Sequence, residues 1–151
     1  MLNEAEVLNP LTRRVIRACI EVHRHLGPGL LESAYEVCLC HELTIAGMAY
    51  ERQKPLPVRY KGVDLDCDYR LDVVVEGKLI VELISVDALL PVHSAQLLTY
   101  LKLSDTRVGL LINFNVPILR DGIKRIANKF PDPSPVQHYT RDDFYPKTRG
   151  R

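Results

Sequence analysis

The sequence predicts an α/β fold in which a mixed β-sheet, containing a three-stranded antiparallel meander, is flanked by helices. Apolar residues recur at helical spacing before residue 50 and again after residue 90, as in helices with one buried face. Between residues 56 and 84 they alternate with polar residues instead, which indicates strands. A chain of 151 residues, 46% of them hydrophobic, is long enough for one domain with its own core.

A first helix is expected directly behind Asn9-Pro10, because asparagine can cap a helix and proline suits its first turn. The apolar residues that follow are spaced three or four apart: Leu11, Val15, Ala18, Cys19, Val22 and Leu26. The other face carries four arginines: Arg13, Arg14, Arg17 and Arg24. We interpret this face as solvated; the alternative is that it contacts nucleic-acid phosphates.

A second helix is expected from about Leu31 to Ala46. Gly27-Pro28-Gly29 separates it from the first helix, and Gly47 stands where a left-handed residue commonly ends a helix. Within it, Glu32 and Tyr35 are three positions apart. These two side chains therefore share a face of the helix.

Two glycine turns divide residues 56–84 into three strands. The first turn, Lys61-Gly62, fits a two-residue hairpin loop that pairs Val58 with Leu65, Arg59 with Asp64 and Tyr60 with Val63. The middle strand alternates over its whole length. One face carries Val63, Leu65, Cys67, Tyr69, Leu71 and Val73, and the other carries Asp64, Asp66, Asp68, Arg70 and Asp72.

The second turn, around Glu76-Gly77, decides which acidic residues face each other. A two-residue loop would place Asp72 opposite Val81, whereas a three-residue loop with Gly77 in a left-handed bulge position places it opposite Glu82. We prefer the longer loop, because it puts Leu71 and Val73 on the same face as Leu79, Val81 and Leu83 and so keeps the apolar face continuous.

The rest of the chain predicts a helix, a strand and a further helix. The first of these helices runs from about His93 to Leu103 and places Gln96 and Tyr100 one turn apart, with His93 as a residue of the helix start. A buried strand follows from Arg107 to Asn113, and a helix from about Leu119 to Lys129. We assign residues 1–130 to a single domain and residues 131–151 to a proline-rich tail, which could dock through Tyr139, Phe144 and Tyr145.

Carboxylates on neighbouring strands suggest a site for a hard cation. Mg²⁺ takes oxygen ligands, commonly one or two carboxylates, and Asp72 and Glu82 could supply that pair, with Glu32 from the second helix as a third acid. The alternative is that these acids lie on the surface, or that Arg70 pairs with Glu82 in a structural ion pair. The four cysteines lack the C-x-x-C spacing of a zinc site, so we interpret them as buried thiols.

Several motifs resemble those of a known family. The stretch Gly29-Leu30-Leu31-Glu32-Ser33-Ala34-Tyr35 is similar to the G-x-x-E-x-x-Y signature of the GxxExxY proteins. Further similar stretches are Asp68-Tyr69-Arg70-Leu71-Asp72, Val81-Glu82-Leu83, Ala95-Gln96-Leu97-Leu98-Thr99-Tyr100-Leu101 and Gly109-Leu110-Leu111-Ile112-Asn113-Phe114. The resemblance covers roughly Leu11 to Asn128.

The GxxExxY proteins resemble a branch of the PD-(D/E)xK nuclease superfamily, whose members cut DNA with Mg²⁺ and share a restriction-endonuclease-like core. This resemblance implies that Asp72 and Glu82 bind the metal, Mg²⁺ or Mn²⁺, and that Glu32 assists them. It also implies a supporting role for Gln96 and Tyr100, which resemble the Q-x-x-x-Y element of RecB-type nucleases.

One position departs from the superfamily pattern. A lysine is usual two residues after the second acid, where this chain has Ile84. Such a lysine can orient the attacking water and offset charge in the transition state, and an isoleucine can do neither. Lys78 and Lys102 are the nearest lysines in the sequence, but neither has the required position on the strand.

Two functional hypotheses follow. The chain is a metal-dependent DNA nuclease, slowed by the missing lysine, or it is a catalytically inactive nuclease-fold protein that binds nucleic acid, a protein partner or a second copy of itself. A net charge of +1 gives no overall attraction to DNA, so any such binding needs a local patch. No signal peptide and no membrane-spanning run is evident, and a cytoplasmic location is expected.

Overall fold

Six strands form one mixed sheet in the computed structural model, which describes residues 3–65, 68–129, 136–139 and 144. The strand order is β1-β4-β5-β6-β7-β8. Strands β5 and β6 are parallel, and the other neighbours are antiparallel. The bounds are Tyr50–Pro55 for β1, Arg70–Val75 for β4, Leu79–Ile84 for β5, Val108–Asn113 for β6, Ile123–Ala127 for β7 and Val136–His138 for β8.

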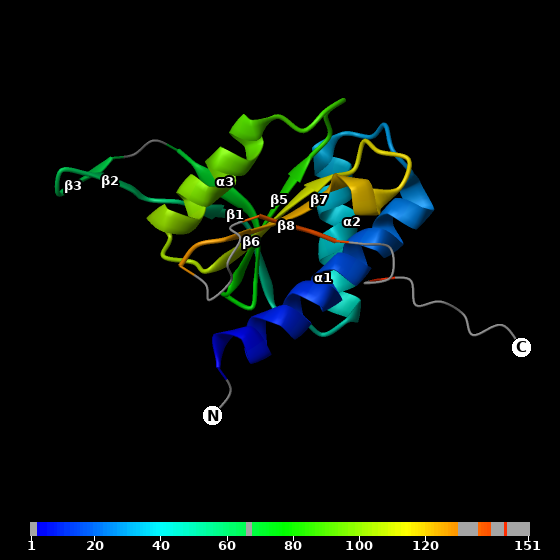
Figure 1. Cartoon of the computed structure of the whole chain (residues 1–151), viewed down its shortest axis with the longest axis horizontal. Coiled ribbons are helices and arrows are strands. Elements are labelled where there is room, and N and C mark those ends of the chain that lie inside the picture. The colour runs from blue at the N-terminus through cyan, green and yellow to red at the C-terminus, as the bar shows by residue number, and fades with distance from the viewer. Residues whose placement is uncertain (1–2, 66–67, 130–135, 140–143, 145–151) are drawn as a thin grey trace, which may run out of the picture.

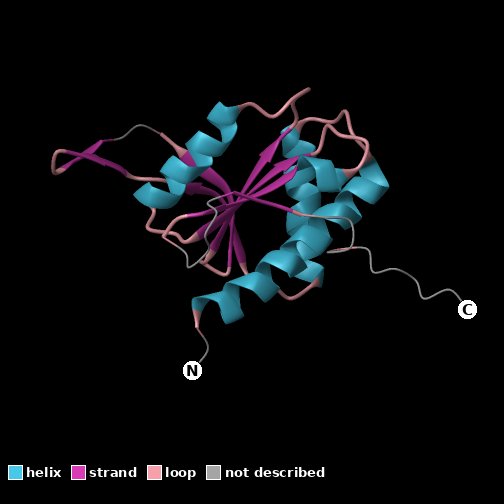
Figure 2. Ribbon diagram, in the orientation of Figure 1, coloured by secondary structure: helices cyan, strands magenta, loops and turns pink. Residues whose placement is uncertain are grey.

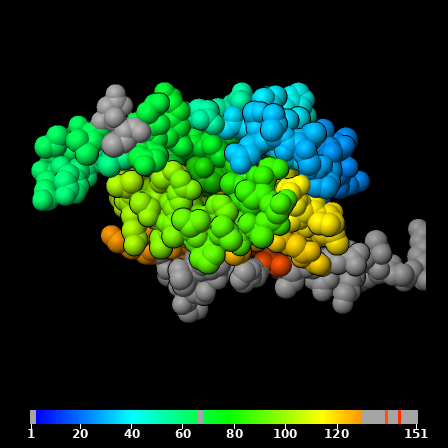
Figure 3. Space-filling model, turned by 90° about the horizontal axis from the view of Figure 1, so that it is seen from above, coloured from blue at the N-terminus to red at the C-terminus, as the bar shows by residue number. Residues whose placement is uncertain are grey.

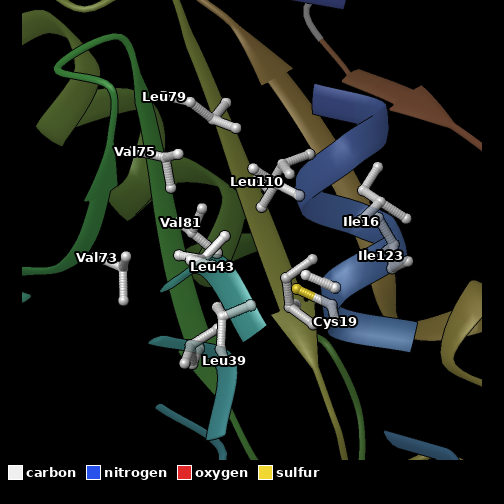
Figure 4. Close-up of a cluster of buried hydrophobic side chains, with 14 of the residues drawn as sticks. Ile16, Cys19, Leu39, Leu43, Val73, Val75, Leu79, Val81, Leu110 and Ile123 are labelled. Carbon is white, nitrogen blue, oxygen red and sulfur yellow. The ribbon is translucent and has the colours of Figure 1, made fainter. Parts of the chain in front are cut away.

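Helices cover both faces of this sheet, which confirms the predicted α/β architecture (Figures 1 and 2). Helices α1 (Glu4–Leu26) and α2 (Glu32–Ile45) pack on one face, and α3 (Pro91–Leu103), which connects the parallel strands β5 and β6, packs on the other. Figure 4 shows the larger core, where Ile16 and Cys19 of α1 and Leu39 and Leu43 of α2 meet alternate residues of the strands. Because successive side chains of a strand point to opposite faces of the sheet, the strands contribute to two separate cores.

Helix α1 begins earlier than its sequence pattern predicts. The side chain of Asn3 accepts a hydrogen bond from the backbone N–H of Glu6 (2.9 Å), and the Glu6 carboxylate accepts one from the N–H of Asn3 (2.8 Å). This capping box starts the helix at Glu4, so Pro10 lies inside it and the predicted start at Asn9-Pro10 is wrong. Leu8 continues the buried stripe ahead of the proline, and its burial favours the longer helix.

Helix α2 matches its prediction to within one residue at each end. Gly47 has a left-handed backbone, with φ of +72°. The N–H of Gly47 bonds to the carbonyl of Thr44 (3.0 Å), and that of Met48 bonds to the carbonyl of Leu43 (2.9 Å). These two bonds are those of a Schellman motif, in which a left-handed residue stops the helix.

The predicted three-stranded meander is wrong in one respect. The first hairpin has the predicted register, but its strands β2 (Val58–Tyr60) and β3 (Val63–Leu65) form a separate two-stranded ribbon that projects from the body (Figures 1 and 3). On the side away from β5, strand β4 pairs with β1, which the sequence pattern left unassigned. The predicted strand from 63 to 73 is therefore two strands, with residues 66 and 67 outside the described part.

The second turn has the predicted three-residue loop. Val75 pairs with Leu79 and Val73 with Val81, and Gly77 is left-handed with φ of +64°. This register places Asp72 and Glu82 on the same rung of the sheet. The register predicted for this turn is therefore confirmed.

The predicted helix from Leu119 to Lys129 is wrong. A 3₁₀ turn, η1 (Leu119–Gly122), leads into β7, which pairs with β6. Ile123 and Ala127 pack toward α1 and α2, while Ile126 packs toward α3, so the segment is buried on both faces. A short apolar run of this kind does not distinguish a helix from a buried strand by its spacing alone.

The tail adds strand β8 beside β7. The rings of Tyr139 and Phe144 lie 5.0 Å apart and pack against the core under α1 and α2, as the docking prediction requires for these two residues. Tyr145 lies outside the described residues. Across the described ranges, no helix is long and apolar enough to cross a lipid bilayer.

Candidate functional site

The ladder of backbone hydrogen bonds between β4 and β5 stops one rung before Asp72 and Glu82. Its last pair is Val73 with Val81. On the next rung the N–H of Asp72 donates to Glu82 Oε1 (3.2 Å), and the N–H of Leu83 donates to Asp72 Oδ2 (2.9 Å). Two carboxylates thus replace backbone carbonyls as acceptors where the strands separate.

Strand β1 changes at the same rung. Arg52 pairs with Val73 and Lys54 with Leu71, but Gln53, which lies between them, has a left-handed backbone with φ of +49°. Its side-chain Nε2 donates to Asp72 Oδ1 (3.4 Å). Beyond this rung Leu71 packs in the core under α3, not beside Val73 as the alternation predicts. The change of face occurs at Asp72, opposite the irregular backbone of Gln53 and at the one rung missing from the β1–β4 pairing.

Burial dominates the electrostatics of the acid pair. Desolvation, followed by the charge of Asp72 and a hydrogen bond with its carboxyl group, raises the pKa of Glu82 to about 9. Desolvation also raises the pKa of Asp72, although the N–H of Leu83 partly offsets it. At neutral pH and without a cation, the pair therefore holds a proton between its two carboxyl groups.

A third acid, Glu36, faces the same rung and was missed in the sequence. It lies on α2, is only 6% exposed, and accepts hydrogen bonds from Arg52 Nη2 (2.8 Å) and Gln53 Nε2 (2.6 Å). Its negative charge contributes to the raised pKa of both Asp72 and Glu82. One signal could have revealed it, because Glu36 is one helical turn after Glu32. Gln53 had none, since β1 itself was unassigned.

The predicted third acid, Glu32, lies at the rim of the site. It is the first residue of α2, is exposed, and accepts a hydrogen bond from the N–H of Ser85 (3.3 Å). A cavity of about 200 Å³ extends from it to Asp72 and is lined by Glu32, Ser33, Glu36, Gln53, Asp72 and Leu83. A second hollow of about 380 Å³ shares Glu32 and Ser33 and opens past Leu30 and Leu31. Glu32 thus lines both hollows.

Tyr35 holds the segment that leads into α2. Its hydroxyl donates to the carbonyl of Gly27 (2.6 Å) and accepts from the N–H of Leu30 (3.1 Å). Its ring stacks on Phe114, which follows β6, with centroids 4.3 Å apart. Tyr35 therefore fixes the start of α2, and with it Glu32, relative to the sheet.

Gln96 and Tyr100 are brought together on α3, on the other face of the sheet. Gln96 Nε2 lies 2.6 Å from the hydroxyl of Tyr100, whose ring packs at the edge of the α3 core. Burial raises the pKa of Tyr100, and the charges of Glu82 and Asp72 contribute to the rise. The two residues are thus within electrostatic reach of the acid pair, as a supporting role would require.

The acid pair receives no positive charge from Ile84, Lys78 or Arg70. Ile84 is half-buried and packs with Leu89, Leu98 and Tyr100 against the α3 core. Lys78 lies in the turn at the far end of β5. Arg70 Nη2 pairs with Asp68 (3.6 Å), so the alternative of an Arg70–Glu82 ion pair is wrong. The prediction for His93 is confirmed, because its Nδ1 accepts the N–H of Leu90 (2.9 Å) at the start of α3.

The acid pair fits a hard divalent cation bound through two carboxylates. Within the part of the chain that the structure describes, no group of three His, Cys, Asp or Glu residues is placed to hold a metal. Mg²⁺ needs no such group, because water and substrate oxygens commonly complete its octahedron. A cation would also take the place of the proton that joins the two carboxyl groups. The donor set is all oxygen, which suits Mg²⁺ or Mn²⁺.

Comparisons with known proteins place the site within a recognised sequence family. A family model of the PD-(D/E)XK nuclease superfamily matches residues 9–126, which include Glu32, Asp72, Glu82, Gln96 and Tyr100. No curated protein matches significantly, and no solved structure does. The matched range thus contains every residue of the predicted site.

Proposed function

Because the chain belongs to the PD-(D/E)XK nuclease superfamily, we propose that it is a metal-dependent nuclease that hydrolyses phosphodiester bonds in DNA. The observation that carries the proposal is the rung on which Asp72 and Glu82 lie side by side, each accepting a backbone N–H of the other strand where the ladder of β4 and β5 ends. Two half-buried carboxyl groups on one rung repel each other when both are ionised, unless a cation or a proton joins them. A bound divalent cation is the functional form of this arrangement.

In the proposed reaction, Asp72 and Glu82 hold Mg²⁺ or Mn²⁺. The cation would polarise the phosphoryl oxygen and lower the pKa of a bound water. The N–H groups of Leu83 and Asp72 fix one oxygen of each carboxylate and so orient the other toward the ligand. Glu32, at the mouth of the cavity, is placed to accept a proton from a water that enters there.

Gln96 and Tyr100 have a supporting role in this proposal. Their mutual hydrogen bond and the packing of Tyr100 hold the phenol hydroxyl on the face of the sheet toward which Glu82 points. The signature at Gly29, Glu32 and Tyr35 further supports membership of the GxxExxY branch of the superfamily. In that branch the stacked Tyr35 would have the positioning role described above.

The same geometry predicts slow cleavage. A charged donor beside the transition state typically contributes on the order of 10²–10³ in rate, and Ile84 supplies none. This position also favours the second candidate, an inactive nuclease-fold protein that binds nucleic acid, a protein partner or a second copy of itself. Ile84 packs against an apolar cluster, as expected if a lysine is no longer needed at this position.

A comparison of three proteins tests the proposal. Wild type, Ile84→Lys and Asp72→Asn are assayed for Mn²⁺ binding and for cleavage of single- and double-stranded DNA with Mg²⁺ or Mn²⁺. We expect weak cleavage by wild type, a gain on the order of 10²-fold in Ile84→Lys, and loss of both binding and cleavage in Asp72→Asn. Leu89→Lys, in the same apolar cluster, is the matched control for adding a lysine near the site.

The outcomes separate the two candidates. A wild type that binds Mn²⁺ but does not cut, with cutting restored by Ile84→Lys, supports an inactive descendant of a nuclease. A wild type that neither binds metal nor cuts, together with an Ile84→Lys variant that does neither, rules out the nuclease proposal.

A further inference from the structure

Gln53 has a backbone conformation that its position in the fold does not require. Among the described residues, the other non-glycine residues with positive φ lie in turns, bends or loops, whereas Gln53 lies inside strand β1. A left-handed conformation is unfavourable for a residue with a side chain, and such outliers persist where the surroundings enforce them. The cause must therefore lie in what the side chain of Gln53 contacts.

Its side chain joins two acids from different elements. Gln53 Nε2 donates to Glu36 on α2 at 2.6 Å and to Asp72 on β4 at 3.4 Å. Arg52 holds the other oxygen of Glu36 at 2.8 Å, and Arg70 donates to the main-chain carbonyl of Gln53 at 3.2 Å. A regular extended residue at position 53 would continue the backbone pairing with Asp72, as its neighbours Arg52 and Lys54 do with theirs.

We propose that Gln53 is a positioning residue of the cation site, and this inference rests on the proposed function. Its carboxamide, held by Glu36, fixes the free oxygen of Asp72 so that the carboxylates of Asp72 and Glu82 meet the same cation. The left-handed backbone is the cost of aiming that carboxamide at both acids. Gln53 also lines the cavity beside Asp72, together with Glu36 and Glu32.

The competing explanation is that Gln53 serves folding alone, as a partner for the buried Glu36. The two explanations differ in the direction of a measurable effect. Glycine adopts the left-handed backbone without strain but has no carboxamide. A folding role alone therefore predicts that Gln53→Gly lowers the stability of the protein and leaves metal binding unchanged, whereas a positioning role predicts weaker metal binding whatever the change in stability.

The experiment measures the urea midpoint without metal and the dissociation constant for Mn²⁺ by calorimetry. In Gln53→Gly we expect a dissociation constant raised roughly 10–100-fold, the usual effect of losing a group that orients a metal ligand. The midpoint shows that the variant is folded under the conditions of the binding measurement. Gln53→Asn, which keeps a shorter carboxamide and tolerates this backbone, should recover part of the affinity. Lys61→Gly is the matched control, because Lys61 has the same φ of +49° in the ribbon turn.

Each result decides the question. Mn²⁺ binding by Gln53→Gly equal to that of wild type overturns the positioning role, and together with a lowered midpoint it assigns Gln53 to folding alone. Weaker binding in Lys61→Gly as well would also overturn it, because the effect would not be specific to the site. If wild type itself binds no Mn²⁺, the proposed function fails and the positioning role fails with it, a result distinct from failure of the Gln53 variants alone.

Discussion

At the scale of single residues, Asp72 and Glu82 have two roles: one oxygen of each carboxylate accepts a backbone N–H, and the other is available to a ligand. Each accepts a backbone N–H of the other strand, so each replaces a hydrogen bond that the diverging strands lose. Loss of both side chains would leave two N–H groups without these acceptors, which is costly in a buried setting. The remaining oxygens are those available to a ligand. Substitutions at these positions must therefore preserve the acceptors, as Asn and Gln do.

The raised pKa of Glu82 predicts a pH-dependent stability. Burial and Asp72 raise this pKa from 4.5 to about 9. Between these values the folded protein binds more protons than the unfolded chain, so the free energy of unfolding falls as pH rises, by up to about 1.4 kcal/mol per pH unit. Urea denaturation with a chelator at pH 6, 7 and 8 measures the slope.

Glu82→Gln keeps the shape of the protonated acid. We expect this variant to be more stable than wild type at pH 8 and to show a shallower slope between pH 6 and 8. Glu51→Gln, at an exposed acid on β1, is the control and should retain the wild-type slope. Equal slopes in Glu82→Gln and wild type would show that Glu82 is already ionised in the folded protein.

The sequence predicted the acid pair because strand parity is simple. Glycine at position 77 and the apolar alternation determine one register, and that register puts Asp72 opposite Glu82. The contribution of Glu36 and Gln53 was not predictable in this way. Gln53 acts through a backbone irregularity that leaves no period in the sequence. Glu36 has the helical spacing from Glu32, but its contacts with β1 could not be predicted while β1 was unassigned.

At the scale of elements, helices α1 and α2 and the hairpin turns followed from local patterns, whereas strand partners did not. The alternation of residues 63–73 continues through the ribbon and into the sheet, so it does not show where the chain leaves the sheet. Asp68, with φ of +53°, interrupts the extended backbone there. The buried segment after η1 has the same ambiguity, because β7 gains its identity from pairing with β6.

The projecting ribbon predicts that the fold tolerates its removal. Strands β2 and β3 pair only with each other among the described strands, and Tyr60, Val63 and Leu65 are exposed. Replacing residues 58–67 by Gly-Ser-Gly should change the free energy of unfolding by less than about 1 kcal/mol. The ends are compatible with this closure, because the N–H of Leu56 bonds to the carbonyl of Tyr69 (2.8 Å).

A second substitution makes the excision informative. Leu56 precedes the ribbon but is buried in the α3 core, so Leu56→Ala in the shortened chain should cost about 2–5 kcal/mol. Urea denaturation followed by circular dichroism measures both changes. If the shortened chain is already unfolded with Leu56 intact, the ribbon contributes to the core.

At the scale of the whole molecule, the site lies where the two cores meet at one end of the sheet. The core under α1 and α2 carries Glu36 and supports Asp72, while the core under α3 carries Tyr100 and supports Ile84. Strands β4 and β5 separate at this end and admit polar groups between the two layers. A cation held by Asp72 and Glu82 would join these strands directly, so its binding should stabilise the entire fold.

Stabilisation by Mn²⁺ is therefore the most direct measurement of the central claim that Asp72 and Glu82 form a cation site. At a free concentration of 100 times the dissociation constant, a ligand that binds only the folded state raises the free energy of unfolding by about 2.7 kcal/mol. We expect a rise of this size in urea denaturation of wild type, none in Asp72→Asn, and the full rise in Asp64→Asn, an exposed acid on the ribbon. An equal rise in wild type and Asp72→Asn, or none in wild type, would contradict the account.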